Sequence, residues 1–174
     1  MNFNDNILVL DGAMGTMIQK YGLDERDFHK PVPADDLVNR DPAALKALEE
    51  SRMELKGNNE CLNLTRPDII FDIHRKYIEA GADIIESNTF SANSISQEEY
   101  GLADIAGELA REGAAIARRA ADQSGRKVYV AGSVGPTSKS LTLAQNVEHP
   151  EYRPYGFREM VSAYREQIRG LIDG

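Results

Sequence analysis

The sequence predicts an α/β fold in which short parallel strands alternate with helices. Three short apolar segments, at residues 7–10, 82–86 and 128–131, are each bounded by polar residues or glycine, as strands covered on both faces commonly are. A helical pattern follows each of them. Because the order is strand, helix, strand, helix, strand, helix, we expect βαβ units with right-handed crossovers.

The helices are predicted from apolar periodicity and from residues typical of helix ends. They are expected at residues 16–21, 41–57, 65–81, 104–122 and 157–171. Asp41 and Pro42 resemble an N-cap and a first helical position, and Thr65 with Asp68 has the spacing of a capping box. The last helix follows a loop of some twenty residues and is expected to turn one stripe of side chains inward: Phe157, Val161, Tyr164, Ile168 and Leu171.

Residues 23–40 have little periodicity and contain Pro31 and Pro33 among scattered charges. We therefore expect an excursion from the core over about residues 23–64, in which the helix that begins near Asp41 decorates one face. Strands and helices on either side of this excursion belong to the same predicted domain.

Composition limits the classes of function. The chain has 174 residues, 41% of them hydrophobic and 28% charged, and a net charge of −8, which suits one folded domain without an attraction for nucleic acid or anionic membranes. The N-terminus is polar, and no apolar run reaches the 18 residues of a membrane span, so we expect a cytoplasmic protein. A single cysteine, Cys61, excludes a disulfide within the chain.

Polar side chains follow each predicted strand. Asp11 follows the first, Glu86 to Asn88 end the second, and Ser133 follows the third. Because the carboxyl ends of parallel strands share one edge, Asp11 and Glu86 are expected on one rim, where two carboxylates could hold an ammonium group. A second interpretation is equally open from the residues alone. In it, Asp11 caps the next helix and Glu86 meets a buried cation.

The turn after the first strand contains Gly12, Ala13 and Gly15, which allow a tight bend and a close backbone approach to an anion. Neither G-x-G-x-x-G nor a P-loop is present, so the turn does not indicate nucleotide binding. Cys61 is interpreted as a packing residue, and the three histidines lack metal-ligand spacing. The sequence thus predicts no catalytic nucleophile–base pair and no metal ligands within this chain.

Four segments resemble, in order, the homocysteine-binding domain of cobalamin-dependent methionine synthases, within the homocysteine S-methyltransferase family. They are residues 7–17, 55–60, 79–90 and 130–137. The resemblance implies a (βα)8 TIM-type barrel, of which residues 1–174 are a partial homocysteine-binding domain with about three parallel strands and the barrel incomplete. It also implies zinc and cobalamin in the full-length enzyme, together with folate- and cobalamin-binding domains.

The resemblance implies a homocysteine pocket with one wall in this chain. Asp11, Gly12 and Ala13 would contact the amino-acid end of homocysteine, and four residues would line the same pocket: Glu86, Ser87, Asn88 and Thr89. The zinc ligands of the family are three cysteines from later segments, and none of them is present, because Cys61 lies in a different motif. The isolated chain is therefore predicted to be inactive.

Two alternatives remain open at this point. One is a stand-alone homocysteine methyltransferase that uses betaine or S-methylmethionine as the methyl donor. The other is a non-catalytic half-barrel that self-associates through its open strand edges. Coding sequence after Gly174 would decide between the two enzymes, because a methionine synthase should continue through folate- and cobalamin-binding modules. A Cys followed later by a Cys-Cys pair would confirm the zinc enzyme, and their absence would exclude it.

Overall fold

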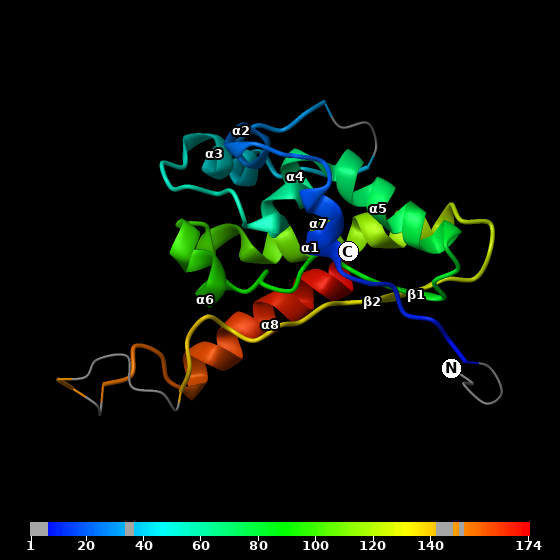
Figure 1. Ribbon diagram of the computed structural model, residues 1–174. Coiled ribbons are helices and arrows are strands. Elements are labelled where there is room, and N and C mark those ends of the chain that lie inside the picture. The colour runs from blue at the N-terminus through cyan, green and yellow to red at the C-terminus, as the bar shows by residue number, and fades with distance from the viewer. Residues whose placement is uncertain (1–6, 34–36, 142–147, 150–151) are drawn as a thin grey trace.

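Helices are the main regular element in the computed structural model (Figure 1). The structure describes residues 7–33, 37–141, 148–149 and 152–174. The expected loop at residues 137–156 lies partly outside these ranges. The helices are α1 (Met14–Gln19), α2 (Glu25–His29), α3 (Pro42–Glu50), α4 (Leu62–Thr65), α5 (Pro67–Glu79), α6 (Ser94–Gln97), α7 (Ala106–Asp122) and α8 (Phe157–Asp173). Short 3-10 turns are η1 (Asn59–Cys61), η2 (Glu98–Tyr100) and η3 (Ala103–Ile105), and the strands are β1 (Ile84–Glu86) and β2 (Tyr129–Ala131).

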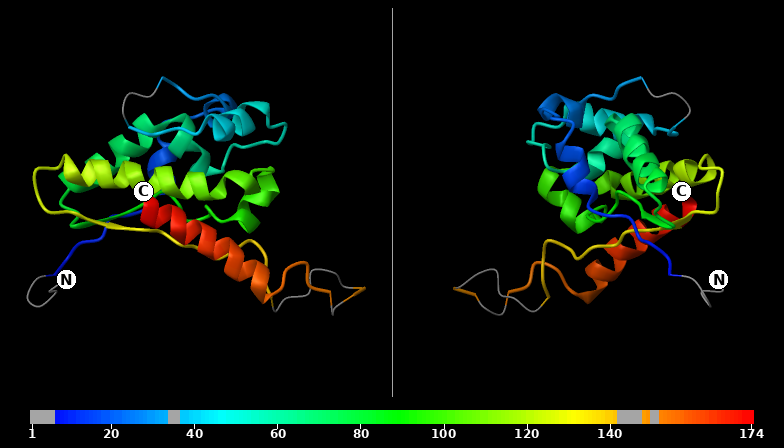
Figure 2. Two further views of the ribbon diagram at one scale, coloured as in Figure 1. Left: turned by 180° about the vertical axis from the view of Figure 1, so that it is seen from behind. Right: turned by 45° about the vertical axis from the view of Figure 1, so that its right-hand side comes forward.

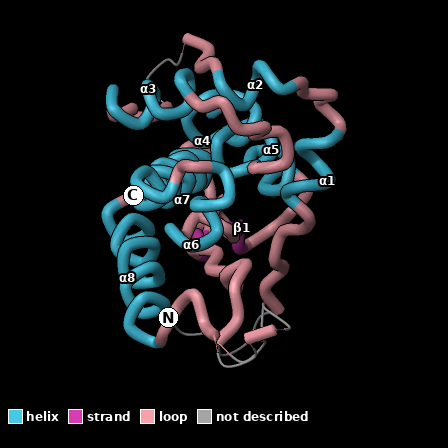
Figure 3. The backbone as a smooth tube through the Cα atoms, turned by 90° about the vertical axis from the view of Figure 1, so that its left-hand side faces the viewer, coloured by secondary structure: helices cyan, strands magenta, loops and turns pink. Residues whose placement is uncertain are grey.

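The two strands are parallel, and Ile85 in β1 is in register with Val130 in β2. Helix α5 precedes β1 and packs near it, and α7 precedes β2 and packs near it. This alternation of strands and helices is that of βαβ units. Helix α7 packs against both α5 and α8, and α7 and α8 lie side by side in both views of Figure 2. Figure 3 shows how small the strands are beside the surrounding helices. The parallel α/β arrangement predicted for residues 82–86 and 128–131 is therefore confirmed, with shorter strands.

The first predicted strand, residues 7–10, is reduced to one parallel bridge between Leu10 and Ile84. Backbone hydrogen bonds still align it with β1, because Asp11 N–H donates to the Ile84 carbonyl at 2.9 Å. The prediction that this segment is buried on both faces is wrong: Ile7 is 94% exposed, and Val9 and Leu10 are about half exposed. The segment pairs with β1 along one edge only, and no described residues bury the side chains of Ile7, Val9 and Leu10.

The hydrophobic core lies mainly between the helices. Its largest cluster includes Ile70 and Ile73 from α5 and Leu109 from α7. Residues 23–64, expected to leave the core, add several side chains to the same cluster: Phe28, Ala44, Leu48, Leu55, Cys61, Leu62 and Leu64. The expected excursion is thus wrong for these side chains, because apolar residues without helical periodicity are buried by short helices and turns.

Two predicted helix ends differ from the structure. Helix α3 ends at Glu50 rather than near Gly57. The chain after it returns to the core, where the Glu25 carboxylate accepts the backbone N–H groups of Leu55 and Lys56. Thr65 does not cap α5, since it ends α4 and its Oγ1 donates to the Cys61 carbonyl at 3.1 Å.

Helix α8 buries a different face from the one predicted. The buried residues are Met160, Ala163, Gln167 and Gly170. Of the predicted stripe, Phe157 is 73% exposed, and Val161 and Ile168 are also exposed. Tyr164 is half-buried, and Leu171 packs against the core as predicted. Small residues explain the difference, because a Cβ at Gly170 would meet the Gly107 carbonyl oxygen of α7, so only a face without bulk can approach α7 this closely.

None of the helices in the described part of the chain is both long enough and apolar enough to span a lipid bilayer.

Candidate functional site

A polar cavity of about 520 Å³ opens where the chain leaves β1, β2 and the Leu10 bridge. Its walls contain all seven residues expected to bind substrate: Asp11, Gly12, Ala13, Glu86, Ser87, Asn88 and Thr89. Ser133, which follows β2, is also part of the wall. The expectation that polar residues after successive strands share one rim is therefore confirmed as a matter of position.

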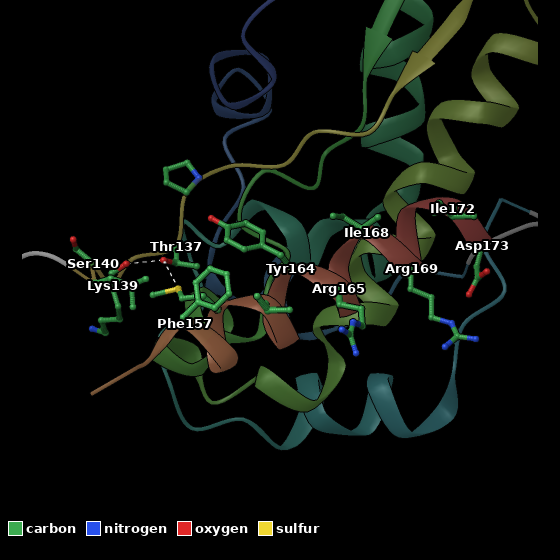
Figure 4. A pocket seen from close by; sticks show the side chains of 14 residues that line it. Thr137, Lys139, Ser140, Phe157, Tyr164, Arg165, Ile168, Arg169, Ile172 and Asp173 are labelled. Carbon is green, nitrogen blue, oxygen red and sulfur yellow. Dashed lines mark hydrogen bonds between the residues drawn. The ribbon is translucent and has the colours of Figure 1, made fainter. Parts of the chain in front are cut away.

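A larger groove of about 1120 Å³ runs along the exposed face of α8 (Figure 4). Phe157, Tyr164, Ile168 and Ile172 present mostly apolar surface to it. The groove lies apart from the ends of β1 and β2 and contains none of the predicted site residues. The smaller cavity is the better candidate site, because several polar groups converge on it from separate elements.

Asp11 is held at the edge of β1. Its Oδ2 accepts the backbone N–H of Glu86 at 3.1 Å, whereas its Oδ1 is buried and has no hydrogen-bond partner among the described residues. Burial raises the pKa of Asp11 to about 6; the hydrogen bond from Glu86 opposes this shift and the negative charge of Glu86 adds to it. One carboxylate oxygen of Asp11 is thus left without a hydrogen-bond donor among the described residues.

The alternative roles considered for the two carboxylates are wrong. The N-cap position of α1 is Ala13, and no side chain in the described part of the chain caps this helix, so Asp11 is not a capping residue. Glu86 is exposed rather than buried against a cation. Both carboxylates therefore stay at the cavity rim without a structural partner that neutralises them among the described residues.

The turn after Asp11 packs closely against α5. A Cβ at Gly12 would lie 3.2 Å from the hydroxyl oxygen of Tyr77, and that hydroxyl donates to the Ala13 carbonyl at 3.4 Å. The small residues at this bend therefore let the backbone itself form the cavity wall.

Three residues join the ends of the two strands. Thr89 Oγ1 donates to the Ser133 carbonyl at 2.8 Å, Ser87 Oγ lies 2.7 Å from Thr89 Oγ1, and Ser133 N–H donates to Ser87 Oγ at 3.0 Å. Since the Thr89 proton is used on Ser133, Ser87 is the donor to Thr89. The two hydroxyl groups are thus committed to holding the cavity wall together.

Asn88 is fixed by a second buried network. Its Nδ2 donates to the Asn59 carbonyl at 2.8 Å and to Asn63 Oδ1 at 2.9 Å. Asn63 Nδ2 in turn donates to the carbonyls of Asn88 and Leu109. The polar segment after β1 is therefore held from α4 and α7 as well as from β2, which makes the cavity a preorganised one.

Comparison with known proteins agrees with this arrangement. The sequence profile of the family described as "Homocysteine S-methyltransferase" matches residues 8–174. The chain belongs to the homocysteine S-methyltransferase family. Asp11 and the segment after β1 both lie within the matched range.

Solved structures of a homocysteine methyltransferase, MmuM from Escherichia coli, have a similar fold. The metallated form matches with a TM-score of 0.61 and 23% identity over 97% of this chain and 51% of that one. The oxidized form gives 0.60 and 23% over 96% and 49%. At this identity the likeness concerns the fold alone. The chain spans about half the length of these structures.

The zinc ion that the resemblance implies does not fit the residues that the structure describes. Among the residues that the structure describes, no group of three His, Cys, Asp or Glu side chains could hold a metal. Cys61 is fully buried in the core, and burial raises the pKa of its thiol well above the usual value, which disfavours the thiolate that metals bind.

Sequence reasoning missed Glu60 as a member of the site. Glu60 lies in η1, lines the cavity, and accepts the backbone N–H of Ser91 through Oε1 at 2.7 Å. Burial raises the pKa of its carboxyl group. Glu60 belongs to the segment at residues 55–60 that resembles the family, but it follows no strand, so the strand-end argument could not find it.

Proposed function

We propose that the cavity binds L-homocysteine and forms one wall of the pocket of an enzyme that methylates homocysteine to methionine. The observation that carries the proposal is Asp11 Oδ1, which has no hydrogen-bond partner among the described residues. Asp11 lines a preorganised polar cavity in a chain of the homocysteine S-methyltransferase family. A buried carboxylate oxygen without a donor is unfavourable, and an amino-acid ammonium group supplies that donor.

The proposed roles follow from position. Asp11 and Glu86 are the carboxylates that would attract the ammonium group of homocysteine, since both line the cavity. The backbone of Gly12 and Ala13 would contact the amino-acid end, and Ser87, Asn88 and Thr89 would shape the adjoining wall. Their hydrogen bonds to Asn59, Asn63 and Ser133 would keep that wall rigid as the substrate enters.

Methyl transfer itself is proposed only for the full-length protein. The reaction forms a bond from the homocysteine sulfur to the methyl carbon, breaks the bond from the donor to that carbon, and requires the thiol to lose its proton. The described residues do not fit a zinc site that would stabilise the thiolate. The 174-residue chain should therefore give no methionine from homocysteine with methylcobalamin or S-methylmethionine, and detectable methionine would contradict this proposal.

For the methyl donor, we propose methylcobalamin recharged from 5-methyltetrahydrofolate, on folate- and cobalamin-binding domains of a cytoplasmic full-length enzyme that also holds zinc. The resemblance of residues 7–17 and 79–90 to cobalamin-dependent methionine synthases supports this choice. The alternative is a betaine- or S-methylmethionine-dependent enzyme. Methionine formation by the full-length protein, assayed with each donor in turn, distinguishes them.

Substrate binding can be located on the chain itself. In an amide-resolved NMR titration of the 174-residue chain with L-homocysteine, the backbone signals of Gly12, Ala13 and Ser87 should shift saturably. Signals from the far side, such as that of Ser162 on α8, should not. L-homocysteine that causes no shift at the cavity, or equal shifts throughout the chain, would contradict the proposal.

A second candidate function, self-association of a non-catalytic half-barrel, draws support from α8. Phe157 is 73% and Ile172 78% exposed, and both line the apolar groove in Figure 4. Exposed apolar surface of this kind favours association. Sedimentation analysis over a range of concentrations tests this candidate, since a monomer at every concentration would exclude it.

A further inference from the structure

Gln167 connects α8 to both walls of the candidate pocket. Its side chain is fully buried, and Nε2 donates to the Thr89 carbonyl at 2.7 Å and to the Ser133 carbonyl at 3.4 Å. Thr89 follows β1 and Ser133 follows β2, so one amide group from a third element joins the two strand ends. Gln167 does not itself line the cavity.

Fold stability alone does not account for a glutamine at this position. The Oε1 atom of Gln167 is buried and has no hydrogen-bond partner among the described residues, which is unfavourable. A methionine has a similar shape and helix propensity and would bring no unpaired oxygen into the core. What methionine lacks is the donor that the two carbonyls receive from Nε2.

The position of Gln167 is itself tightly constrained. Gly170, one turn later, brings α8 against the Gly107 carbonyl of α7, and Ala163, one turn earlier, is buried on the same face. Helix α8 therefore has little freedom to slide or rotate, and the Gln167 amide is held at a fixed place relative to the strand ends. A rigid second layer of this kind is what keeps binding groups in place.

We propose that Gln167 is a positioning residue for the pocket. It holds the carbonyls of Thr89 and Ser133 in place. The hydrogen bonds among Ser87, Thr89 and Ser133 then keep the pocket wall in the shape that binds the substrate. The inference rests on the proposed function, because the ligand whose binding depends on this geometry is homocysteine.

The test compares the wild-type chain with Gln167→Met, which keeps the volume and removes the donor, and with Gln167→Glu, which presents an acceptor to two carbonyls. Ala163→Gly is the matched control, because it weakens the same face of α8 without touching the strand ends. Two quantities are measured for each: the Kd for L-homocysteine by calorimetry, and amide hydrogen exchange at Ser133 and Gly135, whose N–H groups donate to Ser87 Oγ and the Phe90 carbonyl.

Gln167→Met is expected to weaken homocysteine binding about tenfold, as loss of an ordered hydrogen bond does, and to speed exchange at Ser133 and Gly135 selectively. Gln167→Glu should have the larger effect when its carboxyl group is ionised, because only the protonated form can still donate to one of the two carbonyls. Ala163→Gly should lower the melting temperature with the Kd unchanged. An unchanged Kd in both Gln167 variants would overturn the proposal. If the wild-type chain binds no homocysteine, the proposed function fails. Amide hydrogen exchange at Ser133 and Gly135 then decides whether Gln167 positions the strand ends, and unchanged exchange in both Gln167 variants would overturn that role.

Discussion

Gly113 in α7 lies directly behind Thr89, so that a Cβ placed on Gly113 would come within 2.5 Å of Thr89 Cγ2. The same Cβ would lie 2.6 Å from Asn63 Nδ2, which fixes Asn88. A helix residue without a side chain is thus required for the polar segment after β1 to pack against α7.

The substitution Gly113→Ala tests this contact. An alanine in a helix normally stabilises it by about 1 kcal/mol relative to glycine. Here we expect the free energy of unfolding to fall by about 1–2 kcal/mol, because overpacking against Thr89 and Asn63 outweighs the helix propensity. Urea denaturation measures the difference.

Gly107→Ala is the matched control on the same helix. The nearest atoms to its Cβ would be those of the Glu166 side chain, the first at 3.2 Å, and this flexible side chain can move aside. This variant should therefore be as stable as the wild type or more stable. Equal stabilisation by Gly107→Ala and Gly113→Ala would show that Thr89 does not press on α7.

The buried carboxyl group of Glu60 should make the free energy of unfolding depend on pH. Its pKa is raised by burial in the folded chain, so folding favours the protonated carboxyl group, and the stability that this group contributes is lost as the pH rises through the folded pKa. Glu60→Gln keeps an oxygen for the Ser91 N–H but carries no charge. The variant should therefore gain stability relative to the wild type as the pH is raised from 4 to 8, in a series of urea denaturation curves. A constant difference across that range would contradict the raised pKa.

The buried ring of His74 should make the free energy of unfolding depend on pH in the opposite direction. It is fully buried on α5, both ring nitrogens lack a partner among the described residues, and burial lowers its pKa from 6.5 to about 4. A histidine with a lowered folded pKa contributes stability that is present above its unfolded pKa and lost as the pH falls. The difference of pKa corresponds to about 3 kcal/mol.

His74→Leu removes the titrating ring at similar volume. Between pH 7 and pH 4, the wild type should lose about 3 kcal/mol more of its free energy of unfolding than the variant does. Chemical denaturation at each pH measures this difference. Parallel loss of stability in the two proteins would show that His74 is already protonated, or solvated, in the folded chain.

The rim of the candidate site was predictable because it depends on chain order alone. Parallel strands place their carboxyl ends together, so Asp11, Glu86 and Ser133 could be assigned to one edge from the apolar segments that precede them. The buried face of α8 was not predictable in the same way. Its larger apolar residues form the more obvious stripe, but Gly170 and Ala163 decide which face fits against α7.

Residues whose role depends on distant partners could not be found from the sequence. Glu60 acquires its place in the site through the N–H of Ser91, and Gln167 through two carbonyls at other strand ends. The exposure of Ile7 has a related cause, because an apolar segment indicates a strand but does not specify which residues cover it. Periodicity records the local pattern, and these features depend on packing between elements.

If Asp11 binds the ammonium group of homocysteine, the affinity of the chain for homocysteine should depend on pH. Asp11 has a pKa of about 6 and must be ionised to attract the ammonium group, so homocysteine affinity should rise about tenfold from pH 5 to pH 7. Asp11→Asn retains an oxygen that can accept the Glu86 N–H but has no charge. Its affinity should be weak and should not vary with pH over this range.

Calorimetric titration of the 174-residue chain with L-homocysteine at pH 5 and pH 7, for the wild type and Asp11→Asn, measures all of these quantities. We expect a single binding site whose affinity rises with pH in the wild type and stays low in Asp11→Asn. Absence of saturable binding by the wild type at pH 7, or equal affinity in the two proteins, would contradict it.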